Sequence, residues 1–224
     1  MSNSEELKWL DEIMGNNKRN CFLSFAMRNF LILLFLLLPL GLAHGEVSPS
    51  EYLKKKVDSL LGTLKSEASF EEKKSKVAKI FKASFNMVQL SGMALGREVW
   101  LSLKDEEKGL FVERYTEFLL SFYTSNMKDY KGEGLNMGEA ILKSNGKKAE
   151  VPFIIVVEGK NVAMKYSLKK SKGNGWQIYD VEIEGVRLST QYRNQFTSII
   201  KKNGFKGLLS ALDELILKQG KTAN

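Results

Sequence analysis

The spacing of apolar residues changes twice along the chain, from a helical period to β-strand alternation and back again. Four short β-rich runs lie in the middle of the chain, at 138–143, 149–157, 162–169 and 176–184. Hairpin turn signals separate them: Asn145-Gly146, Glu158-Gly159 and Gly173-Asn174-Gly175. The runs predict a four-stranded antiparallel meander. Because helical segments precede and follow it without a Pro/Ser-rich linker, the expected fold class is α+β in one domain over 46–224.

Helix start signals precede the meander. Ser48-Pro49 places a capping hydroxyl before a proline at the first helical position. Ser69 followed by Glu72 is typical of a capping box. Helical composition continues over 86–100, broken by Gly92 and Gly96, so we expect several helices before the first strand.

The longest helix is expected over 103–127, with Ser102 as its cap. Two neighbouring apolar stripes run along it, and four aromatic residues at helical spacing form the first: Phe111, Tyr115, Phe118 and Phe122. A surface this wide is either buried on more than one side or borders a cavity. After the meander, two further amphipathic helices are expected over 188–203 and 205–220.

An almost unbroken apolar run at 30–42 points to export. It is shorter than the roughly 20 residues that span a bilayer, so it fits a signal-peptide core better than an anchor. Ala43 and Gly45 offer a cleavage site, and the mature chain would then begin at Glu46. We expect 1–45 to be a signal peptide, with translation starting at Met27.

Removing the signal peptide restricts the chemistry of what remains. Cys21 and His44 are the only cysteine and histidine of the chain, and both lie in the segment to be removed. Disulfides, cysteine nucleophiles, histidine bases and Cys/His zinc sites are therefore excluded from the expected mature chain. No metal-ligand spacing stands out elsewhere.

Asp180 is the acid most suggestive of catalysis, because it lies in an apolar strand where burial could raise its pKa. A structural role, with its carboxylate bonded to backbone or to an arginine, is the alternative. Glu182 and Glu184 share its face by strand alternation, which indicates that this face is partly solvated.

The formal net charge is +8, and the segment at 1–45 holds equal numbers of acidic and basic residues, so the mature chain keeps the excess. The lysines are scattered and interleaved with acids, and no aromatic–basic RNA-binding motif is present. We expect no nucleic-acid partner. The basic residues form either solvated faces or a docking surface for an anionic membrane or an acidic partner.

Two stretches resemble the MlaC family of periplasmic phospholipid-binding proteins, the toluene-tolerance auxiliary components of an ABC transporter. The longer one is 175–196 (GWQIYDVEIEGVRLSTQYRNQF), which covers two turns and a strand-to-helix junction. The second is 95–100 (LGREVW), followed by three acidic residues at 105–107 and the aromatic residues Phe111, Phe118 and Tyr123. The similarity extends over essentially the whole expected mature chain.

The resemblance implies a monomeric shuttle in the periplasm that maintains outer-membrane lipid asymmetry and is not an enzyme. It would carry glycerophospholipid between an inner-membrane ABC transporter with an MCE-domain subunit and an outer-membrane lipoprotein complex. Bound phospholipid would be cargo, and no cofactor is implied. The implied layout is NTF2-like, with helices and a curved sheet enclosing an apolar cavity.

The candidate lipid-binding residues come from the aromatic stripe, from the expected strands and from the stretches that resemble the family. They are Trp100, Phe111, Tyr115, Phe118, Phe122, Phe153, Ile155, Met164, Tyr166, Trp176, Tyr179, Tyr192 and Phe196. We expect the four long-helix aromatics to face Phe153, Ile155, Met164 and Tyr166 across a lipid-filled interior. Arg97 and Arg193 are candidates for headgroup or partner contact, because arginine can bind phosphate bidentately.

Two other function classes stay open. An NTF2-like or cyclase-like enzyme would share the layout and could use Asp180 with a tyrosine. A non-catalytic adaptor would have the same fold with a filled core.

Overall fold

The computed structural model describes residues 47–125, 135–157, 160–171 and 175–222. The apolar run at 30–42, the cleavage site and Met27 lie outside the described residues, as do the expected turns at 158–159 and 173–174. Among the helices that are described, none combines the length and the hydropathy needed to cross a membrane.

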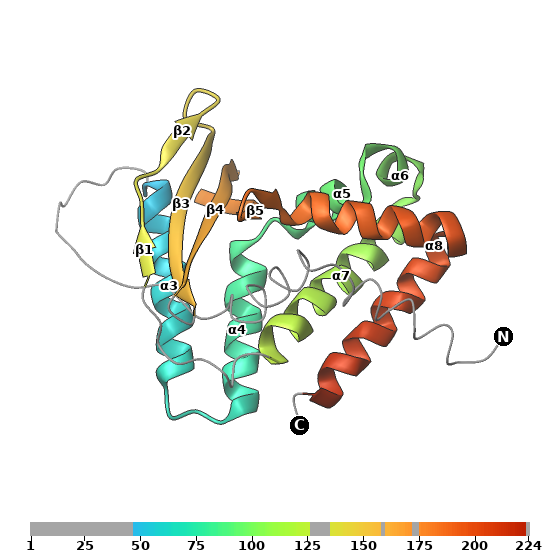
Figure 1. Cartoon of the computed structure of the whole chain (residues 1–224), viewed down its shortest axis with the longest axis horizontal. Helices are drawn as coiled ribbons and strands as arrows, with labels where there is room; N and C mark the ends of the chain where they lie inside the picture. The colour runs from blue at the N-terminus through green and yellow to red at the C-terminus, as the bar shows by residue number, and fades with distance from the viewer. Residues whose placement is uncertain (1–46, 126–134, 158–159, 172–174, 223–224) are drawn as a thin grey trace.

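Two antiparallel helices come first among the described residues. Helix α3 (Pro49–Lys65) begins where Ser48 Oγ accepts a hydrogen bond from the Glu51 amide at 3.1 Å, as its sequence predicts. Helix α4 (Phe70–Ser84) begins at the expected capping box, in which the Ser69 amide donates to Glu72 Oε2 at 2.9 Å. In Figure 1 the two helices form a hairpin whose connection lies at the bottom of the view.

Three helices follow: α5 (Met87–Leu95), α6 (Arg97–Ser102) and α7 (Asp105–Ser125). Gly96 separates the first two at φ +81°, whereas Gly92 lies inside α5, where an added Cβ would be 3.3 Å from the Trp100 ring. The expected cap of α7 is wrong. Ser102 Oγ donates to the Val99 carbonyl at the end of α6, and the Lys104 amide donates to Glu107 Oε2 at the start of α7.

The sheet has six strands in the described residues, with the order β1-β3-β4-β5-β6 and with β2 also paired to β3. The central strands are β3 (Lys148–Val157), β4 (Lys160–Ser171) and β5 (Gly175–Ile183), all antiparallel, which confirms the expected meander. The short strands are β1 (Leu135–Met137), β2 (Ile141–Lys143) and β6 (Val186–Arg187).

Pairing assigns each residue to one of two sheet faces. The core face carries mostly buried apolar residues: Ala149, Val151, Phe153, Ile155, Val162, Met164, Tyr166, Leu168, Ile178, Val181 and Ile183. The opposite, outer face carries a charged cluster: Glu150, Lys165, Asp180, Glu182 and Arg187. Strand β3, which reads as apolar on both sides, exposes Ile154 to solvent at 42% of its surface. Its outer face is therefore not covered at that point.

An irregularity in β5 keeps its apolar residues on the core face. Ser167 pairs with Asp180 and Leu168 pairs with Ile178, so Tyr179 is an extra residue in the ladder. A bulge of this kind shifts the alternation by one. Ile178 before the bulge and Val181 after it therefore both face the core.

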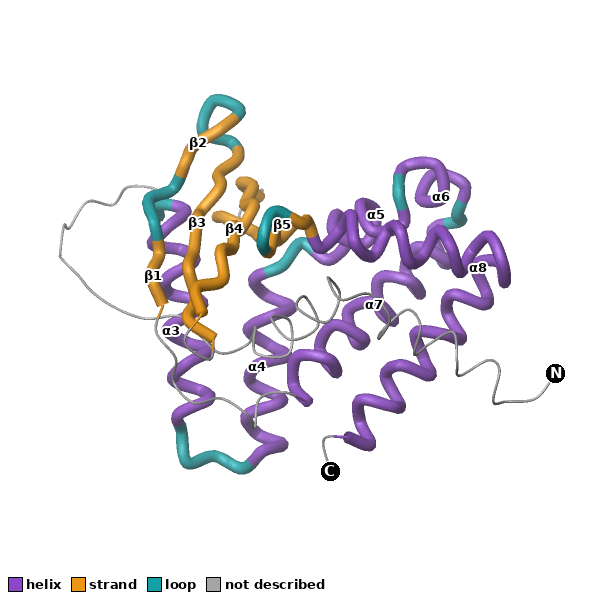
Figure 2. Tube along the Cα trace, in the orientation of Figure 1, coloured by secondary structure: helices purple, strands orange, loops and turns teal. Residues whose placement is uncertain are grey.

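Helix α8 (Leu188–Thr222) bends at Gly204, whose φ of 70° and ψ of 179° interrupt the helix where two helices were expected to meet. Its two arms are seen in Figure 2, with α5 and α7 beside the first. Helix α3 packs on β3 behind the sheet in Figure 1, and α7 packs against α8. The fold is thus the expected α+β layout, with a sheet layer backed by α3 and a helical part built around α7 and α8.

Candidate functional site

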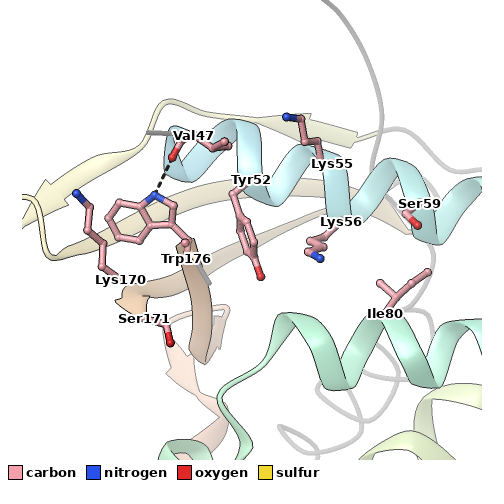
Figure 3. Close-up of a pocket in the computed structure, with 10 residues that line it drawn as sticks. Val47, Tyr52, Lys55, Lys56, Ser59, Ile80, Lys170, Ser171 and Trp176 are labelled. Carbon is pink, nitrogen blue, oxygen red and sulfur yellow. Dashed lines mark hydrogen bonds between the residues drawn. The ribbon is translucent and has the colours of Figure 1, made fainter. Parts of the chain in front are cut away.

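An open pocket lies between α3, α4 and the ends of β4 and β5 (Figure 3). Its volume of about 790 Å³ is within the range of roughly 300 to 1,000 Å³ usual for small-molecule sites. Ten described residues line it: Val47, Tyr52, Lys55, Lys56, Ser59, Ile80, Lys170, Ser171, Gly175 and Trp176. The walls are aromatic and aliphatic, and the polar residues among them are lysines and serines.

Trp176 forms one end of the pocket. It follows Gly175 at the start of β5, and its side chain is 4% exposed. The indole Nε1 donates to the Val47 carbonyl at 2.9 Å, which ties the residues before α3 to the sheet. Lys170 Nζ lies 5.7 Å from the centre of the same ring, at a distance suited to a cation–π contact.

Tyr52 and Ile80 form the walls contributed by the two helices. In Figure 3 the Tyr52 ring extends from α3 and Ile80 extends from α4 towards α3. The Tyr52 hydroxyl is hydrogen-bonded to Ser84, and burial raises the pKa of this phenol above its ordinary value, more strongly than the Ser84 bond lowers it. Tyr52 therefore stays neutral and serves as a wall that links α3 to α4.

The aromatic stripe of α7 lies elsewhere. Phe111, Tyr115 and Phe118 are buried, and their rings contact three aromatic residues of α8, namely Tyr192, Phe196 and Phe205. The centroid distances are 5.4 to 6.3 Å, typical of packed aromatic pairs. The expectation that the sheet faces this stripe is therefore wrong, because α8 occupies that side. Burial also raises the pKa of Tyr192.

The expected strand residues share the core face of the sheet. Phe153, Ile155 and Met164 are buried, and the Tyr166 ring lies 5.0 Å from that of Phe153. Burial raises the pKa of the Tyr166 phenol. Tyr179, the extra residue of β5, is half-buried with Lys148 Nζ 5.8 Å from its ring. Among the candidate lipid-binding residues that the structure describes, Trp176 alone lines the pocket.

The two arginine candidates differ in their surroundings. Arg97 is exposed in the first turn of α6. Arg193 is half-buried, and its Nε donates to the Met93 carbonyl at 2.9 Å. Its side chain also passes Gly96, where an added Cβ would be 3.3 Å from Arg193 Cδ. Arg193 thus joins α8 to the end of α5, and it does not line the pocket.

The surroundings of Asp180 fit the structural role, in which its carboxylate is bonded to backbone or to an arginine. It is fully buried on the outer face and accepts hydrogen bonds from the Val181 amide, the Ser189 amide and Ser189 Oγ at 2.8 to 3.2 Å. Arg187 lies 3.7 Å from Oδ2. The carboxylate therefore holds the start of α8 against β5, and it faces away from the pocket on the core side.

The described residues contain no group of three or more acidic, cysteine or histidine side chains able to hold a metal ion. The pocket itself presents no carboxylate from its described lining. Its arrangement suits an apolar molecule with a polar end.

Comparison with known proteins assigns the family. A family described as MlaC protein matches residues 54–214, which include most of α3, all of α4, the described sheet and most of α8. The chain belongs to the MlaC family.

The proteins similar to this MlaC-family chain include a toluene tolerance protein and a phospholipid-binding protein. The toluene tolerance protein ttg2D of Pseudomonas putida is 28% identical over 102 residues, which cover 44% of this chain and 46% of that protein. The chain thus matches a little under half the length of that curated relative. A phospholipid-binding protein from Ralstonia solanacearum, solved in complex with a phospholipid, has a TM-score of 0.68 at 23% identity, covering 79% of this chain and 99% of its own. This likeness confirms the fold.

Sequence reasoning missed most of the pocket of this MlaC-family chain. Tyr52, Lys56 and Ile80 carry no motif, and they come from two helices that read as ordinary amphipathic segments. A weak signal was present in Tyr52, a large aromatic residue at the border between the apolar and the basic side of its helix. Such a residue can lie at the edge of a cavity as readily as on a solvated surface.

Proposed function

We propose that this MlaC-family chain is an exported phospholipid carrier of the periplasm, and that the acyl chains of its cargo enter the pocket between α3 and α4. The observation that carries the proposal is the pocket itself, whose described lining combines apolar walls from Tyr52, Ile80 and Trp176 with lysine and serine side chains. The phospholipid bound in the Ralstonia structure of the same fold supports it.

The physical need for such a carrier follows from the hydrophobic effect. A two-chain lipid has on the order of 28 methylenes, and exposing each to water costs about 0.8 kcal/mol, or roughly 22 kcal/mol in all. Spontaneous transfer across an aqueous compartment is therefore very slow. A carrier needs an apolar pocket with a polar opening and no reactive group, and the engagement of Asp180 by Ser189 is consistent with a protein that is not an enzyme.

Filling the pocket tests the proposal. Ile80→Trp should lower the amount of phospholipid that copurifies with the mature chain, as measured by native mass spectrometry, while the melting temperature changes by only a few degrees. Leu217→Trp is the matched control, because Leu217 is 66% exposed on α8. If Ile80 instead lay in a tightly packed interior, the larger side chain would lower the stability of the fold, since overpacking costs about 1 to 3 kcal/mol. Normal lipid content in Ile80→Trp would contradict the proposal.

We also propose that the carrier exchanges lipid with an inner-membrane ABC transporter bearing an MCE-domain subunit and with an outer-membrane lipoprotein complex. The net charge of +8 supports docking to acidic surfaces. Attraction between exposed charges falls off within about 8 Å at physiological ionic strength, whereas acyl-chain burial is insensitive to salt. Raising the salt should therefore weaken binding to the MCE subunit without releasing lipid. If salt lowered lipid retention as strongly as it lowered binding to the MCE subunit, the proposal that charge serves docking and acyl chains serve lipid binding would be contradicted.

A further inference from the structure

The polar part of the pocket's described lining, which we call its mouth, is basic. Three of its ten described lining residues are lysines, Lys55, Lys56 and Lys170, and none is acidic. They come from one helix and from the end of β4, so the pocket is flanked by basic side chains from two elements (Figure 3).

The three lysines are not equivalent. Lys56 is half-buried, its Nζ lies 5.4 Å from the centre of the Tyr52 ring, and Figure 3 places it between Tyr52 and Ile80. Lys170 is exposed, with its Nζ 5.7 Å from the centre of the Trp176 ring. Two ammonium groups are thus placed beside the two aromatic walls of the pocket.

Of the three lysines, Lys55 contributes least positive charge to the mouth of the pocket. It is exposed, and its Nζ lies 3.3 Å from Glu51 Oε1, so part of its charge is balanced on its own helix. In Figure 3 its side chain points away from the other residues drawn. We therefore assign the positive charge that a bound headgroup would meet mainly to Lys56, and secondly to Lys170.

We infer that the mouth favours phospholipids whose headgroup carries a net negative charge, such as phosphatidylglycerol, over zwitterionic ones such as phosphatidylethanolamine. The inference rests on the proposed function, because it takes the acyl chains to be in the pocket. The two lipids can have identical chains and the same phosphate. They differ in the terminal ammonium of ethanolamine, which would lie near Lys56 and Lys170 and be repelled by them.

The preference should be modest, because the lysines are accessible to water. Exposed charge pairs contribute little individually, and salt screens them. We expect about a fivefold preference at physiological salt, which corresponds to about 1 kcal/mol. Affinity remains a property of the acyl chains, while the lysines decide between headgroups.

A competition experiment tests the inference. The mature chain is equilibrated with vesicles that contain equal amounts of phosphatidylglycerol and phosphatidylethanolamine with matched chains, and the bound lipids are identified by mass spectrometry. Using one vesicle population means that both lipids are taken from the same surface, so attraction of the basic protein to the vesicle does not bias the ratio. The expected ratio is about five to one, falling towards one at about 1 M salt, where the Debye length is about 3 Å.

Two variants identify the residues responsible. Lys56→Gln combined with Lys170→Gln should bring the ratio of bound phosphatidylglycerol to bound phosphatidylethanolamine below about two to one. Lys201→Gln combined with Lys202→Gln removes the same charge from an exposed part of α8 that does not line the pocket, and should leave the ratio unchanged. Normal lipid content with a ratio near one in the unmodified chain, or an equal change in both double variants, overturns the inference. Absence of bound lipid in every sample would instead contradict the proposed function.

Discussion

Replacing Asp180 with alanine should destabilise the protein more than any exposed carboxylate does. The side chain is fully buried and accepts three hydrogen bonds, two of them from Ser189 in the first turn of α8. Arg187 adds a charge at 3.7 Å. The carboxylate therefore joins β5, β6 and the start of α8.

The magnitude follows from what the substitution leaves behind. Alanine would leave the Ser189 hydroxyl and amide buried without their acceptor, and each unsatisfied group costs about 1 to 3 kcal/mol. The sum for the two groups agrees with the cost of breaking a buried charged network, which is typically about 3 to 5 kcal/mol. For a chain of this size, each kcal/mol corresponds to about 2 to 4 °C, so the melting temperature of Asp180→Ala should fall by roughly 10 °C.

The assay is urea unfolding of the lipid-free mature chain, because bound lipid would stabilise the folded state and mask the difference. Asp180→Asn, which retains one acceptor oxygen, should lose less stability than Asp180→Ala. Asp213→Ala is the control, since Asp213 is half-exposed and pairs with Arg114 at 2.7 Å on the surface. We expect it to cost less than about 1 kcal/mol. An equally small cost for Asp180→Ala would refute the reasoning.

Two other perturbations probe the backbone and the charged outer face. Gly96→Ala should lower the free energy of unfolding by about 1 to 3 kcal/mol, as measured in urea, because Gly96 has φ +81° and ψ 156° beside Arg193. Gly109→Ala is the control: it lies in open space on α7 and should be neutral or stabilising. The hydrogen bond from Lys143 lowers the pKa of Glu150 despite partial burial. Its stabilising effect is therefore complete above its ordinary pKa of 4.5 and lost as pH falls towards the lowered value. Melting curves of the unmodified chain should fall more steeply than those of Glu150→Gln below pH 4.5, and parallel curves would contradict this.

Local signals in the sequence predicted the ends of many elements correctly. The Ser69 capping box, the Asn145-Gly146 turn and the break at Gly204 all lie where the structure has them. These features depend on hydrogen bonds and dihedral angles within a few residues, so the surrounding fold has little influence on them. Ser102 is an exception, because two adjacent helices compete for the same short segment and its hydroxyl bonds to the first.

The candidate site was harder to predict. Trp176 was identified through the family resemblance, whereas Tyr52, Lys56 and Ile80 were missed. These residues are brought together only when α3 and α4 form a hairpin beside the end of β5. A pocket is a place where packing is incomplete, and neither periodicity nor composition reports where two packed surfaces diverge.

The sequence by itself determined the α+β order of elements, the burial of the aromatic stripe on α7, and the family. Only the tertiary structure decided what each buried face contacts. Phe111, Tyr115 and Phe118 are buried as their spacing predicts, yet they pack on α8 and not across from the sheet. The physical reason is that hydrophobic burial is non-directional, so an aromatic stripe is stabilised equally by either partner. The choice depends on where α8 begins, after the bulge at Tyr179 and the Asp180–Ser189 bonds, and on where it bends at Gly204.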